Sequence, residues 1–132
     1  MKTKTILLID DNKIDSFLTK HLLLKNKIGE NIIAVSSAIE ALKFLDTVHN
    51  EPEQIPDFIF LDIRMPEMDG FEFLDDYERL PDTIKSKCDI FMLSSSSDQR
   101  DIDRAARYSY VKMFLMKPLD VNMLKEHIYK IA

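Results

Sequence analysis

Residues 57–70 read DFIFLDIRMPEMDG, an apolar run that ends in a carboxylate and a turn. The run DFIFL (57–61) is short and continuously apolar, which is typical of a strand buried on both faces of a parallel sheet. Asp62 follows at its tip, and Pro66 and Gly70 interrupt the chain before the next helical pattern. A polar strand-to-helix turn would explain these residues, and so would a carboxylate placed at a strand tip for chemistry. The other strands decide between the two.

Four further apolar runs share this character and alternate with helical patterns. They are TILLI (5–9), NIIAV (31–35), CDIFML (88–93) and VKMFLM (111–116). Strands that alternate with helices predict an α/β fold, with a parallel sheet, right-handed crossovers and helices on both faces. We therefore expect a flavodoxin-like, doubly wound (βα)5 fold whose five-stranded parallel sheet has the strand order 2-1-3-4-5.

The helices between these strands have recognisable start signals. After the first strand, four apolar residues lie at helical spacing: Ile14, Phe17, Leu18 and Leu22. After the second strand, Ser37 and Glu40 match the pattern of a capping box. Later helices are expected to begin at Gly70, after Ser97 or Asp98, and after Asp120.

Length and composition restrict the class of protein. The 132 residues have the length of one domain, 1–132, with room for a hydrophobic core. The net charge of −5 gives no general reason to expect nucleic acid or an anionic membrane as a partner. No run approaches the roughly 18 apolar residues of a membrane helix, and the N-terminus MKTKTILLIDD becomes acidic too soon for a signal peptide. The single cysteine, Cys88, excludes a disulfide framework, so we expect a cytoplasmic protein.

Charge is distributed unevenly along the chain. Residues 36–82 hold thirteen Asp or Glu against three Lys or Arg, whereas residues 100–132 hold seven Lys or Arg against four Asp or Glu. The acidic part suggests a cation site and the basic part a docking surface, although solvated helix faces would give the same imbalance.

Acidic residues occupy the carboxyl ends of two strands that this strand order makes neighbours. Asp10 and Asp11 follow the first strand, and Asp62 follows the third. Functional groups of doubly wound sheets gather at this edge. Three carboxylates in one place repel one another and raise one another's pKa, which favours a bound divalent cation. Mg²⁺ is the natural candidate because it prefers oxygen ligands.

Two more strand ends supply a hydroxyl and an ammonium group. Ser94 ends the fourth strand, and Lys117 follows the fifth, where its charge can meet a carboxylate or a phosphoryl oxygen. Each residue has an ordinary explanation: a helix cap for the acid pair, a turn for the serine and a surface position for the lysine. Their occurrence together, each at the tip of a strand, indicates a functional site.

The residues at the strand tips lie in four segments: LLIDD (7–11), FLDIRMPEMDG (60–70), MLSSSSD (92–98) and FLMKP (114–118). In these segments the chain resembles the receiver domain of two-component response regulators. The resemblance spans nearly the whole chain, and its most specific part runs from Asp62 to Gly70. Because no residues remain after the final helix for an output domain, we expect a stand-alone, single-domain response regulator.

The resemblance implies a role for each acidic residue. Asp62 would accept a phosphoryl group from a phosphohistidine of a sensor histidine kinase or of a His phosphotransfer protein. Mg²⁺ or Mn²⁺ would be held by Asp11, Asp62 and the backbone carbonyl of Arg64, while Asp10 would bind the metal directly or through water. The domain would assist its own phosphorylation and dephosphorylation without being a turnover enzyme.

The same resemblance implies a switch. Ser94 and Lys117 would contact the phosphoryl oxygens, Phe114 would be the aromatic switch residue, and the Lys117-Pro118 bond would be cis. The signal would reach an unknown target protein through the face of the fourth helix, fifth strand and fifth helix. The residues expected on that face are Arg100, Arg104, Arg107, Tyr108, Lys112 and Lys125.

Three alternatives stay open at this point. A phosphorelay intermediate would pass the phosphoryl group onward instead of signalling by contact. A small Mg²⁺-dependent phosphatase that works through an aspartyl phosphate would need a second acid two residues after its nucleophile, where this chain has Arg64. A degenerate receiver used as a scaffold would not be expected to retain the whole set of tip residues.

Overall fold

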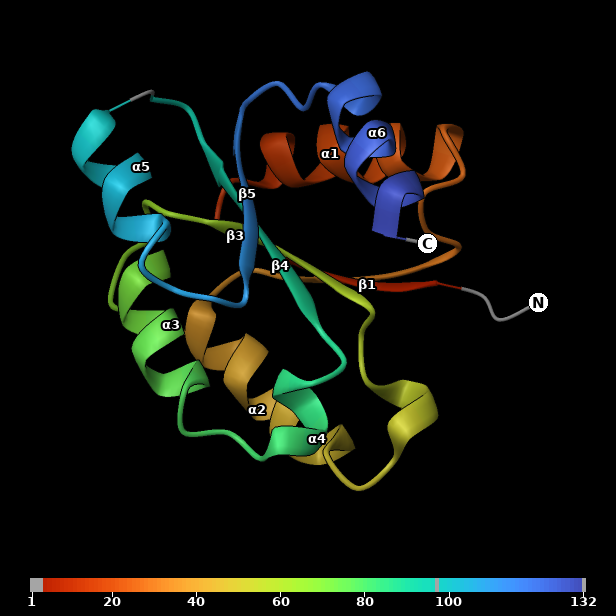
Figure 1. The fold of residues 1–132 in the computed structure, drawn as a ribbon, viewed down its shortest axis with the longest axis vertical. Helices are drawn as coiled ribbons and strands as arrows, with labels where there is room; N and C mark the ends of the chain where they lie inside the picture. The colour runs from red at the N-terminus through yellow and green to blue at the C-terminus, as the bar shows by residue number, and fades with distance from the viewer. Residues whose placement is uncertain (1–3, 97, 132) are drawn as a thin grey trace.

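The computed structural model describes residues 4–96 and 98–131, and its five strands lie side by side in one parallel sheet (Figure 1). The strands are β1 (Thr5–Ile9), β2 (Asn31–Val35), β3 (Phe58–Asp62), β4 (Asp89–Ser94) and β5 (Val111–Met116). Their order is β2-β1-β3-β4-β5, so the predicted flavodoxin-like order is confirmed. Relative to the apolar runs 57–61 and 88–93, β3 and β4 lie one position later, so Asp62 and Ser94 are their last residues.

Helices cover both faces of this sheet. They are α1 (Lys13–Lys25), α2 (Ala38–Val48), α3 (Gly70–Tyr77), α4 (Asp82–Lys85), α5 (Gln99–Ala105) and α6 (Val121–Ile131), with a short 3₁₀ helix at Pro52–Gln54. One face carries α1 and α6, and the other carries α2, α3, α4 and α5 (Figure 1). Because α4 was not predicted, the expected fourth and fifth helices are α5 and α6.

The hydrophobic core consists of two clusters, one on each side of the sheet. In β1, Leu7 and Ile9 face the cluster under α2 and α3, whereas Ile6 and Leu8 face the cluster under α1 and α6. This alternation follows from the two-residue period of a strand. Every residue of β3 is buried, as the apolar run around it predicts for a central strand.

The helix caps agree with the sequence in part. Ser37 caps α2 by accepting the amide of Glu40, but the Glu40 carboxylate bonds the amide of Ser36, so the predicted capping box is incomplete. A complete capping box, which was not predicted, joins Asp69 and Glu72 at the start of α3. Asp98 caps α5, as expected of one of the two candidates. The other candidate, Ser97, lies outside the described residues.

Three of the four apolar residues at helical spacing in α1 face solvent. Ile14, Phe17 and Leu18 are 72%, 69% and 51% exposed, whereas Leu22 packs against the core, and the helix buries Thr19 and Leu23. Unpartnered apolar side chains in a row point to an interaction surface.

Within the described residues, the structure contains no helix with the length and apolar character needed to cross a membrane.

Candidate functional site

The strand pairing brings three carboxylates together at the carboxyl edge of the sheet. Ile9 at the end of β1 is paired with Leu61 of β3, so Asp10 and Asp62 follow at neighbouring tips. Asp10 and Asp62 are buried, whereas Asp11 is exposed. One oxygen from each of the three carboxylates lies within 4.8 Å of the others. Such a cluster of oxygen donors fits a hard divalent cation such as Mg²⁺.

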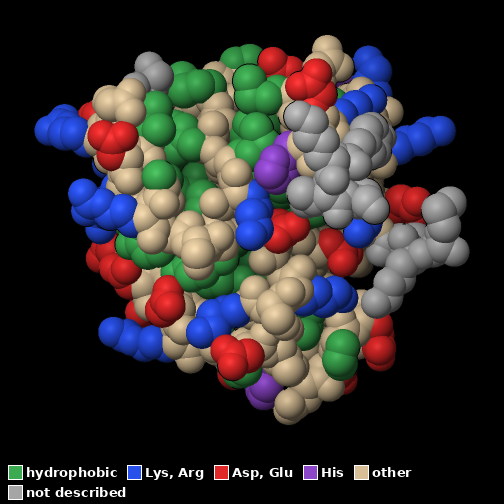
Figure 2. All heavy atoms as spheres, viewed as in Figure 1, with side chains coloured by type: hydrophobic (Ala, Val, Ile, Leu, Met, Phe, Trp, Pro, Cys, Tyr) green, Lys and Arg blue, Asp and Glu red, His purple; other side chains and the backbone are tan. Residues whose placement is uncertain are grey.

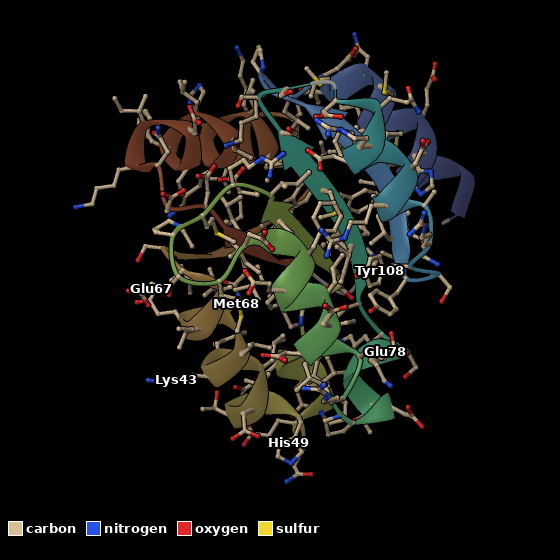
Figure 3. The ribbon with its side chains drawn as sticks, turned by 90° about the vertical axis from the view of Figure 1, so that its left-hand side faces the viewer. Lys43, His49, Glu67, Met68, Glu78 and Tyr108 are labelled. Carbon is tan, nitrogen blue, oxygen red and sulfur yellow. The ribbon has the colours of Figure 1, made fainter. Side chains whose placement is uncertain are left out.

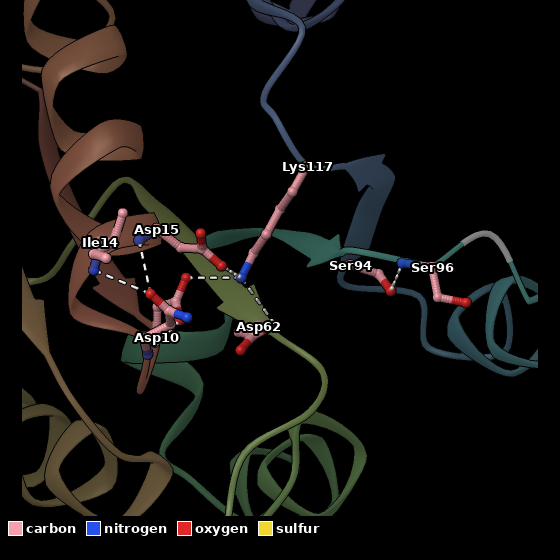
Figure 4. A network of polar contacts seen from close by, with 8 residues as sticks. Asp10, Ile14, Asp15, Asp62, Ser94, Ser96 and Lys117 are labelled. Atoms are coloured by element: carbon pink, nitrogen blue, oxygen red, sulfur yellow. Dashed lines mark hydrogen bonds and ion pairs between the residues drawn. The ribbon is translucent and has the colours of Figure 1, made fainter.

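The ammonium group of Lys117 lies among these carboxylates (Figure 4). Its Nζ atom is 2.9 Å from Asp10, 3.1 Å from Asp15 and 3.4 Å from Asp62. The sequence favoured a divalent cation as the group that offsets the repulsion, and it also allowed the ammonium of Lys117 to meet a carboxylate. Part of the compensation is indeed built into the chain. Asp15, in the first turn of α1, was not predicted to belong to the site. The cis peptide bond expected between Lys117 and Pro118 is confirmed.

Burial and charge shift the pKa values of the central pair in the same direction for different reasons. Burial raises the pKa of Asp62 from 3.8 to about 6, and Asp10 adds to the rise, while Lys117 opposes it. Burial lowers the pKa of Lys117, but hydrogen bonds to Asp10 and Asp15 outweigh burial and hold that pKa above its usual value. The site therefore keeps a charged lysine beside a carboxylate whose ionisation is unfavourable.

Two helix starts hold the carboxylates in place. Asn12 caps α1 by accepting the amides of Ile14 and Asp15, so this helix begins directly after the acid pair. On the other side of the site, Gly70 donates its amide to the carbonyl of Ile63 at 2.8 Å. A Cβ atom at Gly70 would lie 2.8 Å from the backbone oxygen of Asp62, so glycine allows α3 to start against the strand.

The loop between β3 and α3 makes a tight turn beside the carboxylates. Glu67 has a φ of 67°, the left-handed region, and the amide of Met68 bonds the carbonyl of Pro66 at 2.8 Å. Figure 3 shows Glu67 and Met68 on this loop. The loop thus turns the chain from β3 into α3 and leaves Asp62 at the edge of the sheet.

Ser94 and Phe114 lie on adjacent strands. Ser94 is 2% exposed and pairs with Met116 in the β4–β5 ladder, while Phe114 pairs with Met92. Because alternate residues of a strand share a face, Ser94 lies on the same side of the sheet as Met92 and Phe114. The Ser94 hydroxyl accepts the amide of Ser96 at 3.1 Å (Figure 4). Phe114 is half-buried and packs against the core cluster under α2 and α3.

The side chain of Arg64 forms a contact that was not predicted. From the sequence, the backbone carbonyl of Arg64 was expected to bind the metal, and its side chain was given no role in the site. Its guanidinium donates to the carboxylate of Asp101 in α5 at 2.7 Å. Arg64 also lines an open pocket at the strand tips, and the other residues that line it are Asp11, Asn12, Asp15, Asp62, Ser95 and Lys117.

Comparison with known proteins identifies this arrangement. The family model for the response regulator receiver domain matches residues 6–129. The chain belongs to this family. As a receiver domain, it is 30% identical to the response regulator Rcp1 of Synechocystis over 92% of the chain and 81% of the relative. It is also 30% identical to the chemotaxis protein CheY of Bacillus subtilis, over 95% and 94%.

A solved structure agrees with the fold over the whole receiver. A two-component response regulator from Cytophaga hutchinsonii superposes with a TM-score of 0.90 at 31% identity, covering 99% of this chain and 98% of the other. Receiver domains are signalling switches rather than conventional enzymes. They typically bind Mg²⁺ in an acidic pocket and interact with histidine kinases and phosphotransfer proteins, which agrees with the carboxylate cluster found here.

Proposed function

We propose that residues 1–132 form a single receiver domain that is switched by phosphorylation of Asp62. The observation that supports this most strongly is the position of Asp62, which is buried at the tip of β3, 3.4 Å from the Lys117 ammonium. A carboxylate in this position is a nucleophile beside a fixed positive charge. The free thiol of Cys88, buried and without a disulfide, supports a cytoplasmic location.

The reaction needs little besides position and charge. A carboxylate oxygen of Asp62 attacks the phosphorus of a phosphohistidine, a P–O bond forms, and the P–N bond breaks. The electron pair of that bond stays on the imidazole nitrogen, which then takes up a proton. Lys117 neutralises charge on the transferred group, and the Ser94 hydroxyl turns from the Ser96 amide to donate to a phosphoryl oxygen.

The carboxylate cluster supplies the metal ligands of this proposal. Asp11, Asp62 and the backbone carbonyl of Arg64 would hold Mg²⁺ or Mn²⁺, with Asp10 bound directly or through water. When bound, the metal would neutralise negative charge on the phosphoryl oxygens. Asp10 is the most constrained of these residues, because its two oxygens already accept the amide of Asn12 and the ammonium of Lys117 at 2.9 Å each.

Intact mass measurement tests the assignment. With Mg²⁺ and a small acyl-phosphate donor, the wild type should gain the mass of one phosphoryl group, and Asp62→Ala should gain none. Asp82→Ala is a matched control because Asp82 is an exposed aspartate outside the site. A phosphoryl gain by Asp62→Ala equal to that of the wild type would contradict the proposal.

The donor is proposed to dock on α1. Ile14, Phe17 and Leu18 are exposed there, and Leu18 also lines a groove with Asp15, Lys117, Pro118 and Leu119. A histidine kinase or His phosphotransfer protein that covers this surface would bring its phosphohistidine to the edge where Asp62 lies. Phe17→Ser should slow phosphorylation by the protein donor and leave phosphorylation by the small donor unchanged. Equal loss with both donors would contradict docking at α1.

The output surface is proposed to be the face of α5, β5 and α6. Figure 2 shows hydrophobic side chains gathered over α5 and β5, with Lys and Arg around them. A groove between these two elements is lined by Ile102, Ala105, Ala106, Val111, Lys112, Met113 and Phe114.

Not all the basic and aromatic residues that the sequence places on this face are free there. Arg104 covers the ring of Phe71, and the Tyr108 hydroxyl bonds Asp75 of α3 at 2.9 Å. Figure 3 shows Tyr108 beside α3.

Ser94 and Phe114 are proposed to carry the signal to this face. Once Ser94 turns toward a phosphoryl group, the space beside β4 changes, and the half-buried ring of Phe114 can turn inward. Ser94→Ala should still be phosphorylated, but the change in amide exchange around Phe114 should be reduced. Full retention of that change in phosphorylated Ser94→Ala would contradict this route.

A further inference from the structure

The ion pair between Arg64 and Asp101 joins the phosphoryl site to α5. Arg64 lies two residues after Asp62, and Asp101 lies in the first turn of α5. The Arg64 side chain is 65% exposed, whereas the Asp101 side chain is only 12% exposed. Among the described residues, Arg64 is the one side chain that donates a hydrogen bond to this carboxylate. Asp101 therefore depends on Arg64 for the compensation of a nearly buried charge.

Arg64 belongs to the wall of the phosphoryl site as well. It lines the same pocket as Asp62 and Lys117. Most of its side chain is in solvent, so the guanidinium can change partner without first leaving a packed core. One arginine thus borders two anionic positions: the carboxylate of Asp101, which is always present, and the acceptor Asp62, whose charge depends on phosphorylation.

We propose that Arg64 is a further phosphoryl-binding residue, and that its pairing with Asp101 is a latch that phosphorylation of Asp62 releases. This rests on the proposed function of Asp62 as the acceptor. A phosphorylated side chain carries a charge of about −1.5 to −2 and several strong acceptor oxygens, against −1 for a carboxylate. The planar guanidinium binds such a group through two parallel hydrogen bonds, so the phosphoryl group competes well for Arg64.

Release of Arg64 has a consequence for α5. A nearly buried carboxylate without a partner is unfavourable, so Asp101 must move toward water when the latch opens. Asp101 and Ala105 are the two residues of α5 that are buried, so the first turn of the helix moves with Asp101. The proposed output face includes α5, and the latch gives the phosphoryl group a route to it that does not pass through Ser94 and Phe114.

Two substitutions separate the two functions of Arg64. Asp101→Asn removes the competing anion, so Arg64 is free for the phosphoryl group. A guanidinium held across the phosphoryl oxygens excludes the attacking water, so the half-life of phosphorylated Asp62 should lengthen about 3- to 10-fold. Arg64→Gln removes the phosphoryl contact and should shorten that half-life by a similar factor. In the unphosphorylated protein, both substitutions should raise amide exchange in the first turn of α5. A general loss of stability would not move the half-life in opposite directions.

The matched controls come from the same chain. Arg79 and Asp76 form an exposed pair at 3.3 Å in another part of the molecule, so Arg79→Gln and Asp76→Asn should change neither the half-life nor exchange in α5. Asp101→Glu keeps the charge and should restore wild-type behaviour. In the Arg64→Gln background, Asp101→Asn should no longer lengthen the half-life, because its effect acts through the arginine.

The outcomes distinguish this inference from the proposed function. If wild-type Asp62 gains no phosphoryl group, the proposed function fails and the latch fails with it. If the wild type is phosphorylated but Asp101→Asn and Arg64→Gln have the same half-life as the wild type, the latch alone is overturned. Equal and parallel changes in both variants would also overturn it, since they would show a merely structural ion pair.

Discussion

Replacement of Asp62 by asparagine should stabilise the protein at neutral pH. In the folded state, burial raises the pKa of Asp62 from 3.8 to about 6. Because the folded state binds the proton more tightly than the unfolded chain, the contribution of this group to stability falls as pH rises through that interval. Above about pH 6 the ionised carboxylate is therefore a cost of folding, and asparagine removes it with little change in shape.

The size of the effect follows from the shift. At about 1.4 kcal/mol per pKa unit, the rise in the pKa of Asp62 from 3.8 to about 6 corresponds to at most about 3 kcal/mol of lost stability at pH 7.5. Asp62 lines an open pocket, where solvent screens part of this cost. We therefore expect Asp62→Asn to raise the free energy of unfolding by about 1–2 kcal/mol. The advantage of Asp62→Asn should shrink as pH falls through this interval and vanish below about pH 3, where the carboxyl is protonated in both states.

Urea denaturation between pH 4 and pH 8, with EDTA present to exclude metal, measures this difference. Asp46→Asn is a suitable control because the side chain of Asp46 is 81% exposed, and it should show no comparable pH dependence. If Asp62→Asn is less stable than the wild type at pH 7.5, or if its advantage grows toward acid pH, the attraction of Lys117 outweighs burial and the reasoning is wrong.

Three further predictions concern the same edge of the sheet. Gly70→Ala should destabilise the protein in thermal unfolding, because the new Cβ would lie 2.8 Å from the backbone oxygen of Asp62 and 3.0 Å from the Cα atom of Ile63. Asp11→Asn should weaken Mg²⁺ binding, measured by calorimetry, yet leave stability in EDTA unchanged or slightly higher, since an exposed member of a repelling cluster is removed. Lys117→Met should cost about 2–4 kcal/mol in urea denaturation because it leaves Asp10 buried without a counterion. By contrast, Arg79→Met breaks an exposed pair and should cost less than about 0.5 kcal/mol.

The sequence predicts those parts of the site that follow from strand order. Strands rich in Ile, Leu and Phe end at identifiable residues, and the doubly wound topology then makes the first and third strands neighbours. The meeting of Asp10 with Asp62 at one edge needs no further information. The position of Gly70 at the start of α3 is predicted for a similar reason, because a tight turn after a strand favours glycine there.

Contacts between distant charged residues could not be predicted in this way. Asp15 reads as an ordinary acidic residue in the first turn of a helix, and Asp101 reads the same way in α5. Their bonds to Lys117 and Arg64 span 102 and 37 positions, and neither hydrophobic periodicity nor spacing encodes such pairs. The four-residue helix α4 is likewise too short to show a helical period.

The spacing of the apolar residues in α1 also did not predict which side of the helix packs against the sheet. The predicted stripe of Ile14, Phe17, Leu18 and Leu22 has the period of a core-facing helix side. Of these four only Leu22 packs against the core, together with the buried Thr19 and Leu23. A periodic pattern shows that side chains share a face, and only the tertiary arrangement shows whether that face meets the sheet or solvent. An apolar row that remains exposed is then informative, because folding alone does not account for it.

The contacts of α5 explain why this helix is well suited to respond to the site. It has seven residues and buries two of them, Asp101 and Ala105, so little apolar area holds it to the sheet. One of those two anchors is a carboxylate that depends on Arg64, at the edge of the phosphoryl pocket. The groove beside the other anchor contains Phe114. A charge added at Asp62 therefore acts on both anchors of a weakly held helix, through Arg64 on one and through Ser94 and Phe114 on the other. Helices such as α2, which buries four residues and carries no charged anchor, lack that sensitivity.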